Sequence, residues 1–228
     1  MSAATAVLTG VTGGWGRAVL DRFCEQGWNV AVTHRGSAPD DLPAGVLAIE
    51  ADLTDPASAE MVVAATVERF GGVAALANIA GGYAAAGRID EAPVDVWRSQ
   101  MAVNLDTAYH MTRAVLAPMR AAGRGAIVYI GSSATERPFP GAAGYIVSKS
   151  ALAGLMRAVD AEVRVEGIRA NTVVVKIVDT PRNRADDPDA DFSRWTTGGE
   201  LAAVIEWLCS EDSAPLSGGL IPAYGRAR

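Results

Sequence analysis

Residues 4–26 read ATAVLTGVTGGWGRAVLDRFCEQ. The apolar run at 4–9 predicts a buried strand, and the apolar spacing over 16–26 predicts an amphipathic helix that Gly27 ends. The glycines in between permit a tight turn and a close approach of the backbone to a ligand, while the free N–H groups of a helix N-terminus favour an anion. A purely structural turn has the same pattern. We predict that a dinucleotide binds this turn through Gly10, Thr12, Gly14, Trp15 and Gly16.

Apolar runs and amphipathic stretches keep alternating along the rest of the chain. This alternation predicts parallel strands joined by helices on both faces, which is a Rossmann-type doubly wound α/β sheet in a single domain over residues 1–228. The polar segment 179–199 predicts a surface loop or a short lid. We expect strands at 4–9, 29–33, 46–50, 74–79, 126–130, 168–175 and 220–223, and helices at 16–26, 57–70, 94–122 (broken near Asn104 and Pro118), 145–165 and 201–210.

Composition excludes several classes of protein. A net charge of -6 and scattered basic residues argue against nucleic acid as a partner. No apolar run is long enough for a membrane span, and the first residues do not resemble a leader. Cys24 and Cys209 have no neighbouring cysteine and are expected to be buried or half-buried thiols, and with His34 and His110 they give no metal-site spacing. We expect a cytoplasmic protein with a small-molecule substrate and no metal.

Tyr145 and Lys149 are the candidate acid–base pair. They lie four residues apart at the start of a predicted helix, so both side chains share one face. A phenol with a pKa near 10 becomes useful at neutral pH when nearby positive charge, such as an ammonium group, lowers that pKa. The alternative is an ordinary surface pair. Ser132, at a predicted strand end, can donate to a carbonyl oxygen as negative charge develops; its neighbour Ser133 is the second choice.

These motifs resemble those of the short-chain dehydrogenase/reductase family. The glycine turn has the form Thr-Gly-x-x-x-Gly-x-Gly, Asn78-Ile79-Ala80-Gly81 is similar to Asn-Asn-Ala-Gly, and Ser132 precedes Tyr145 by the family's spacing. The resemblance extends from Val7 to about Gly225. It implies hydride transfer between a nicotinamide dinucleotide and a small carbonyl or alcohol.

The resemblance also implies roles for single residues. Tyr145 would exchange the proton, Lys149 would tune Tyr145 and hold the nicotinamide ribose, and Ser132 would polarise the carbonyl. Asn104 would hold a relay water, although a polar residue that kinks a helix looks the same in sequence. Further cofactor contacts implied by the resemblance are Asp52 and Leu53 at the adenine, Asn78, Ala80 and Gly81 along the dinucleotide, and Val178 and Thr180 at the carboxamide.

The end of the second predicted strand bears on the choice of cofactor. An acid there would bind the ribose hydroxyls of NAD and repel a 2'-phosphate. This chain has His34 and Arg35 instead, and a guanidinium suits a phosphate. The sequence therefore favours NADP(H), and NAD(H) stays open because an ordinary solvated loop would tolerate both.

Some features depart from the family pattern. Val175-Lys176 stands where Pro-Gly is usual, and Lys176 has no assigned role. Residues 179–184 and 189–196 resemble dihydropteridine reductases, but that branch typically has an acid after the second strand and lacks the serine. Two alternatives follow: a dihydropteridine-reductase-like imine or quinonoid reductase, and an inactive NAD(P)-binding regulator.

The remaining expectations concern the pocket walls and the assembly. Residues that either line the substrate pocket or simply pack the core or rim are Tyr83, Trp97, Phe139 and Trp195. The resemblance implies a homo-oligomer, a tetramer or a dimer, and the helices at 94–122 and 145–165 are apolar enough to pack across a two-fold axis.

Overall fold

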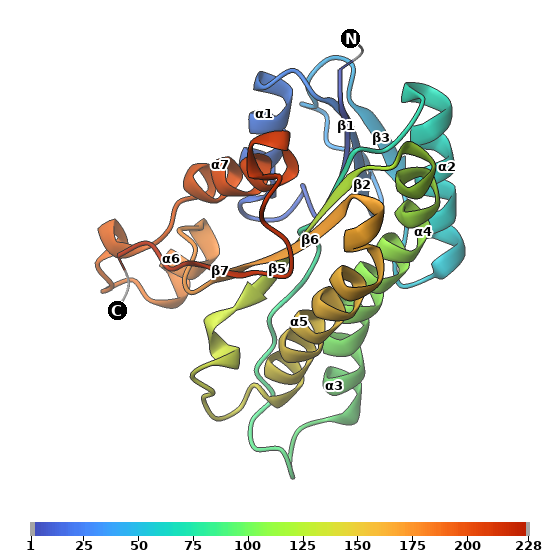
Figure 1. The fold of residues 1–228 in the computed structure, drawn as a ribbon. Helices are drawn as coiled ribbons and strands as arrows, with labels where there is room; N and C mark the ends of the chain where they lie inside the picture. The colour runs from blue at the N-terminus through green and yellow to red at the C-terminus, as the bar shows by residue number, and fades with distance from the viewer. Residues whose placement is uncertain (1–2, 227–228) are drawn as a thin grey trace.

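The structure is a computed structural model that describes residues 3–226, so residues 1–2 and 227–228 of the predicted domain lie outside the described range. Within that range, seven strands form one parallel sheet in the order β3-β2-β1-β4-β5-β6-β7 (Figure 1). The predicted single-domain doubly wound fold is confirmed. The strands are β1 (Thr5–Thr9), β2 (Asn29–His34), β3 (Leu47–Glu50), β4 (Ala75–Asn78), β5 (Gly125–Ser132), β6 (Ile168–Val175) and β7 (Leu220–Ala223).

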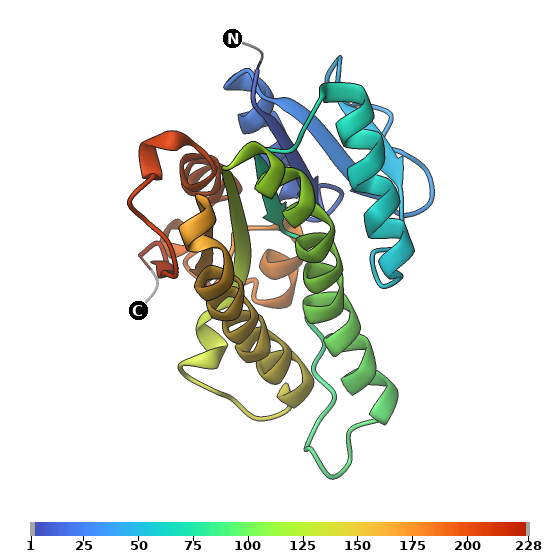
Figure 2. The same cartoon turned by 45° about the vertical axis from the view of Figure 1, so that its right-hand side comes forward.

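Helices cover both faces of the sheet. Helices α2, α4 and α5 lie on one face, and α1 and α7 lie on the other (Figures 1 and 2). Their apolar side chains form a core cluster on each face. Figure 2 shows α4 (green) and α5 (gold) running side by side across their face. The helices are α1 (Gly16–Glu25), α2 (Pro56–Phe70), α3 (Val94–Met101), α4 (Thr107–Ala122), α5 (Ala143–Val163), α6 (Pro181–Asp186) and α7 (Gly198–Cys209).

The strand order reverses between β1 and β4, which pair with each other while their next partners lie on opposite sides. In an open parallel sheet, ligands bind outside the carboxyl ends of the strands at such a reversal. The segments that follow β4 and β5 extend beyond this edge, below the sheet in Figure 1. The topology therefore places the glycine turn and the strand-end side chains at one edge.

The predicted long helix at 94–122 is interrupted once. A π-helical turn, Ala102–Asp106, separates α3 from α4, and Asn104 lies in this turn, as predicted. The predicted break near Pro118 is wrong, because α4 continues through it. Proline removes one backbone hydrogen bond from a helix. The helix survives since Val115 and Met119, fully buried on either side of Pro118, hold it against the sheet.

Segment 179–199 is more ordered than a surface loop. It contains α6 and a single 3-10 turn, Phe192–Arg194. Thr180 caps α6, its hydroxyl accepting from the Asn183 N–H, and Pro181 occupies the first helical position. Both are helix-start signals that the sequence already carried.

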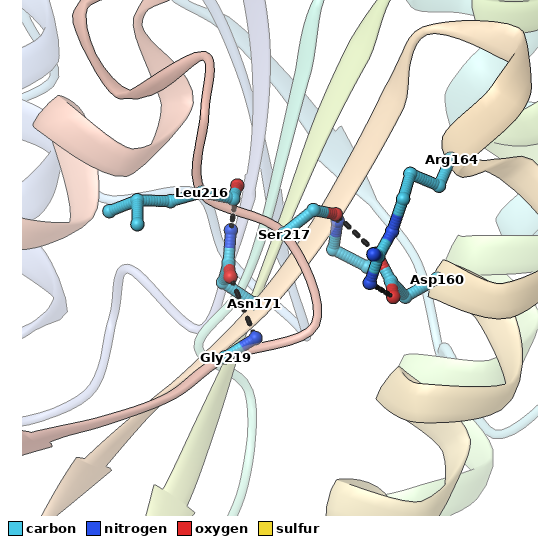
Figure 3. Close-up of polar contacts among 7 residues, drawn as sticks. Asp160, Arg164, Asn171, Leu216, Ser217 and Gly219 are labelled. Atoms are coloured by element: carbon cyan, nitrogen blue, oxygen red, sulfur yellow. Dashed lines mark hydrogen bonds and ion pairs between the residues drawn. The ribbon is translucent and has the colours of Figure 1, made fainter.

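The short, half-exposed strand β7 is tied to the rest of the molecule by polar contacts (Figure 3). Asn171 on β6 donates to the Leu216 carbonyl at 2.9 Å and accepts from the Gly219 N–H at 3.0 Å. Ser217 donates to Asp160 on α5. These contacts fix the loop that delivers β7, and hence the residues after it, to the functional edge. Within residues 3–226, no helix is long and apolar enough to cross a bilayer.

Candidate active site

Two adjoining cavities open at the carboxyl ends of the strands. Their volumes are about 800 Å³ and about 590 Å³. Five residues line both cavities, so the two form one continuous cleft across the reversal between β1 and β4. The shared residues are Trp15, Ile79, Gly81, Gly82 and Tyr83.

The glycine turn forms the floor of the smaller cavity. Gly10 has φ +74°, and a Cβ there would lie 2.6 Å from the Ala80 nitrogen. A Cβ on Gly16 would lie 2.2 Å from the Gly10 oxygen. The Thr9 hydroxyl accepts from the Ile79 and Ala80 N–H groups at 3.1 and 3.0 Å, which joins the end of β1 to the end of β4. Only glycine permits this close packing of backbone on backbone.

The N-terminus of α1 faces the same cavity. Its cap residue, Trp15, makes no side-chain capping hydrogen bond, and the first turn carries no acidic side chain. The Gly16 and Ala18 N–H groups donate to the Gly13 and Trp15 carbonyls, and the positive end of the helix dipole still favours an anion such as a diphosphate here. The turn and helix therefore fit a dinucleotide, and all five residues predicted there line the smaller cavity: Gly10, Thr12, Gly14, Trp15 and Gly16.

The far end of the smaller cavity carries the residues predicted for the adenosine half: His34, Arg35, Asp52 and Leu53. His34 is buried, with its Nδ1 2.8 Å from the Gly36 oxygen, whereas Arg35 is exposed. Asp52 is the one acidic side chain among the described residues that line this cavity. Hydrogen bonds from the Thr54 hydroxyl and N–H hold the pKa of Asp52 below its ordinary value.

Ser132, Tyr145 and Lys149 all line the larger cavity. Ser132 is the last residue of β5, and its hydroxyl accepts from the Ala134 N–H at 3.2 Å. Tyr145 shares a hydrogen bond with Ser132, and Lys149 lies one helical turn further along α5. Ser133, the weaker candidate, also lines this cavity but begins the 3-10 turn beyond the strand.

Burial has the largest effect on the pKa values of Tyr145 and Lys149. It raises the pKa of Tyr145, although the hydrogen bond with Ser132 acts in the opposite direction. It also lowers the pKa of Lys149 to about 8, and the ammonium donates to the Ile130 carbonyl at 2.8 Å. The predicted lowering of the phenol's pKa is therefore not a property of the protein alone, because the burial of Tyr145 outweighs its hydrogen bond with Ser132. It depends on the positive charge that a bound nicotinamide would bring.

Asn104 lies beneath the cleft and not in its lining. Its side-chain oxygen accepts from the Gly82 N–H at 3.0 Å, and its nitrogen donates to the Gly82 oxygen at 2.9 Å and to the Ser148 hydroxyl at 3.2 Å. A Cβ on Gly81 would lie 2.8 Å from Asn104 Oδ1 and 3.3 Å from Lys149 Nζ. Asn104 thus fixes the loop after β4, and its predicted part in a water relay stays a prediction.

Of the other predicted cofactor contacts, some line the cleft and others lie outside its lining. Ala80 and Gly81 line the smaller cavity, and Val178 lines the larger one. Thr180 lines neither; it caps α6, and a Cβ on Gly14 would lie 3.2 Å from its methyl group. Asn78 is buried in β4 below the cleft, and neither of its amide atoms has a hydrogen-bond partner among the described residues.

Three of the four predicted wall residues, Tyr83, Phe139 and Trp195, line the larger cavity. Trp97 does not; it lies on α3, where its backbone packs against Gly144. Sequence reasoning missed Tyr224, whose hydroxyl donates to Glu136 Oε2 at 2.8 Å across the cavity lining. Its position directly after β7 is the signal that was available, since all parallel strands end at this edge.

Lys176 and the two cysteines take no part in the proposed acid–base set. Lys176, at the Pro-Gly position, is half-buried and lines the larger cavity. Cys24 is half-buried in α1 and Cys209 is buried in α7, as predicted. Among residues 3–226 there is no group of three His, Cys, Asp or Glu side chains suited to hold a metal.

Comparison with known proteins agrees with this cleft. Residues 4–191 match the family described as short chain dehydrogenase. The chain is 32% identical to the 2-(R)-hydroxypropyl-CoM dehydrogenase of Xanthobacter autotrophicus, over 96% of each chain. It is 32% identical to the D-beta-hydroxybutyrate dehydrogenase of Rhizobium meliloti, over 94% of each. Identity to the 3-oxoacyl-[acyl-carrier-protein] reductase MabA of Mycobacterium bovis is 29%, over 97% of this chain and 91% of MabA.

A solved structure shows the same fold. A short-chain type dehydrogenase/reductase from Mycobacterium ulcerans superposes with a TM-score of 0.91 at 22% identity, covering 99% of this chain and 90% of that one. None of these comparisons gives support specific to the dihydropteridine reductases.

Proposed function

The chain belongs to the short-chain dehydrogenase/reductase family, whose members are NAD(P)-dependent oxidoreductases acting on CH–OH or C=O groups, and on this premise we propose that it reduces a small ketone or aldehyde with NADPH, or oxidises the corresponding alcohol with NADP⁺. One observation carries the proposal. Ser132, Tyr145 and Lys149 line a cavity that is continuous with the one over the glycine turn. A substrate carbonyl beside these side chains would lie next to the reactive end of a dinucleotide in the cleft.

The residues of the chain divide the chemistry among them. The bound dinucleotide supplies the hydride in reduction and accepts it in oxidation. Ser132 donates a hydrogen bond to the substrate oxygen as negative charge develops there. Tyr145 gives its proton to that oxygen in reduction and takes it back in oxidation. Lys149 holds the nicotinamide ribose and keeps a positive charge near Tyr145, which favours the phenolate.

The preference for NADP(H) rests on the end of β2. Arg35 is exposed beside the smaller cavity, and its guanidinium lies near enough to Asp52 to lower that carboxyl's pKa. A guanidinium at this place favours a 2'-phosphate, and Asp52 is already engaged by Thr54.

The relatives do not decide the substrate, because those named above act on a coenzyme M derivative, a hydroxy acid and an acyl-carrier-protein thioester. The proposed activity is tested with ketones, quinones and quinonoid dihydropterin, each with NADPH and with NADH, followed at the nicotinamide absorbance band. We expect NADPH consumption with ketones, and a loss of about 100- to 1000-fold in kcat for Ser132→Ala.

Two results would overturn this proposal. Turnover of the dihydropterin alone, indifferent to Ser132→Ala, would identify an imine or quinonoid reductase. Dinucleotide binding with no turnover of any compound would identify an inactive NAD(P)-binding regulator.

We also propose a cytoplasmic homo-oligomer, a dimer or a tetramer. Apolar side chains stay exposed on the helices expected to pack across a two-fold axis: Val94 and Trp97 on α3, Tyr109 on α4 and Val147 on α5. Size-exclusion chromatography with light scattering should give a mass of two or four chains, and a monomer at micromolar concentration would refute this assembly.

A further inference from the structure

Aromatic side chains gather in the larger cavity out of proportion to their number. The chain has 5 Trp, 5 Tyr and 4 Phe, which is 6% of its residues. Within the described part of the chain, six of these side chains line this one cavity: Trp15, Tyr83, Phe139, Tyr145, Trp195 and Tyr224.

Three of the rings form a connected series that begins at the proposed acid. The Tyr83 ring meets the Tyr145 ring edge-on, with centroids 5.1 Å apart and an interplanar angle of 87°. The Phe139 ring follows, 6.4 Å from Tyr83 and tilted by 49°. Tyr83 is nevertheless 48% exposed and Phe139 43% exposed. Large rings left in water beside a reaction centre mark a surface that a ligand covers.

Core packing does not account for the exposure of Tyr83 and Phe139, which lie on separate loops, whereas Trp195 is buried. Tyr83 follows β4, Phe139 lies between β5 and α5, and Trp195 belongs to segment 179–199. Trp195 is held in place, because its ring packs 4.8 Å from Phe192, and Arg184 covers the Phe192 ring at 4.8 Å. Rigid aromatic walls bind a flat ligand with little loss of conformational entropy.

The charged groups of the same cavity do not select an ionic substrate. The exposed side chains at its mouth have both signs, with Glu136, Asp186 and Asp187 against Arg137, and the less exposed Lys149 and Lys176 also line the cavity. Glu136 already accepts from Tyr224, and Asp186 pairs with Arg182. Substrate recognition therefore depends on the rings more than on a charge.

We propose that the substrate is an aryl ketone, bound with its aromatic ring against Tyr83 and Phe139 and its carbonyl oxygen toward Tyr145 and Ser132. This inference rests on the proposed function for its chemistry. Reduction transfers a hydride from NADPH to the carbonyl carbon and a proton from Tyr145 to the oxygen, which gives the aryl alcohol and NADP⁺.

A binding experiment tests the aromatic site without turnover. Benzamide and cyclohexanecarboxamide have the same number of heavy atoms and the same carboxamide group. They differ in whether the six-membered ring is flat and aromatic or puckered and saturated, so their dissociation constants on the NADP⁺-saturated protein compare the two kinds of ring. We expect benzamide to bind at least about fivefold more tightly, the factor that one aromatic pair of about 1 kcal/mol produces. Phe139→Leu and Tyr83→Leu should each reduce this ratio toward one.

Trp207→Leu is the matched control, because the Trp207 side chain on α7 is 42% exposed and lines neither cavity. It should leave the ratio unchanged. Equal binding of the two amides by the unmodified protein, or a ratio that Phe139→Leu does not change, would overturn the proposal. Phe139 lies in an exposed loop, so this variant keeps the test valid even if Tyr83→Leu fails to fold.

Kinetics separate this inference from the function on which it rests. The ratio of kcat/KM for acetophenone to that for cyclohexyl methyl ketone should fall about fivefold in Phe139→Leu, and the intrinsic reactivities cancel between variants. If both ketones are reduced and the ratio does not change, the aryl specificity is wrong and the carbonyl reductase stands. If neither is reduced while benzamide still binds preferentially, the aromatic site stands and the proposed reaction is wrong.

Discussion

At the scale of single residues, the buried ammonium of Lys149 should control the alkaline side of the activity. Burial lowers the pKa of Lys149 to about 8 and raises that of Tyr145 above its ordinary value, so the lysine loses its proton first as pH rises. We predict that kcat/KM for carbonyl reduction falls with rising pH through about pH 8, measured over the range in which the fold is stable.

Lys149→Arg provides the check on this assignment. A guanidinium keeps its proton throughout this range, so the fall in kcat/KM should move to higher pH even though the absolute rate decreases. An unchanged alkaline limb in Lys149→Arg would show that another group titrates there.

Arg35 should set the preference between the two dinucleotides. In Arg35→Glu, the ratio of kcat/KM with NADPH to that with NADH should fall about 10- to 100-fold, because a charge-assisted contact to the phosphate is lost and a repulsion replaces it. Arg124→Glu is the control, since this exposed arginine lies just before β5, at the opposite edge of the sheet. If the ratio of kcat/KM with NADPH to that with NADH stays constant in Arg35→Glu, the end of β2 does not recognise the 2'-phosphate.

Residue identities in the cleft were predictable only where a motif fixes the spacing. The spacing of Ser132, Tyr145 and Lys149, together with the alternation of strands and helices, was enough to predict that they meet. Tyr224 was not predicted because its contact with Glu136 joins residues 88 positions apart and no local pattern marks it. Asn78 shows the converse, since its motif marks it for the cofactor whereas the folded chain buries it and leaves it out of the lining of both cavities.

At the scale of elements, the loop after β4 is fixed by the π-helical turn below it. Gly81→Ala should lower kcat/KM about 10- to 100-fold and cost about 1–3 kcal/mol of unfolding free energy, because its Cβ would press on Asn104 Oδ1 and Lys149 Nζ. Neither partner can withdraw easily, since both are buried and hydrogen-bonded.

Gly82→Ala is the control for this prediction. A Cβ on Gly82 would meet only Val103 Cγ1, at an ordinary 3.8 Å, so the free energy of unfolding should stay close to that of the unmodified chain. If the two alanine variants behave alike, the space under Gly81 is not what positions Lys149.

The interruption of the 94–122 helix shows how far a sequence predicts an element. A break at Asn104 could be expected from a polar residue within an apolar face, but its π-helical form depends on the hydrogen bonds to Gly82 from another part of the chain. The low helix propensity of proline gave a wrong prediction at Pro118, because the tertiary packing of its buried neighbours outweighs one lost backbone hydrogen bond.

At the scale of the whole molecule, the Asp160 cluster, which consists of Asp160, Arg164 and Ser217, attaches the loop before β7 to α5 (Figure 3). Burial acts to raise the pKa of Asp160, yet hydrogen bonds from Arg164 and Ser217 more than offset it and hold that pKa below its ordinary value. A folded pKa below the unfolded one means that this stabilisation is complete above about pH 4 and disappears as pH falls through the folded value.

Asp160→Asn should therefore lower the free energy of unfolding by about 1–3 kcal/mol at pH 7, and the difference should narrow below about pH 4. Denaturant unfolding of both proteins at pH 7 and again below about pH 4 measures the loss of unfolding free energy and its narrowing in acid. Asp21→Asn is the control: Asp21 also pairs with an arginine four residues away, but both partners are 41–43% exposed, and the change should stay within about 0.5 kcal/mol. Equal losses in the two variants would contradict the role given to the cluster.

The overall topology was the most predictable property of this chain. Alternating strands and helices restrict the sheet to parallel, right-handed crossovers, and the glycine turn locates the reversal of strand order. The depth of the cleft was not predictable in the same way, because its walls come from loops after β4, β5, β6 and β7 that meet only in the folded molecule.

The central claim, that the Tyr145 hydroxyl exchanges the proton beside a bound dinucleotide, is tested most directly by Tyr145→Phe. Steady-state turnover of a carbonyl substrate and the dissociation constant of NADPH should be measured on the same preparation. We predict that turnover falls at least about 1000-fold while NADPH affinity stays within about threefold. Turnover within about tenfold of the unmodified protein, with NADPH still bound, would contradict the account.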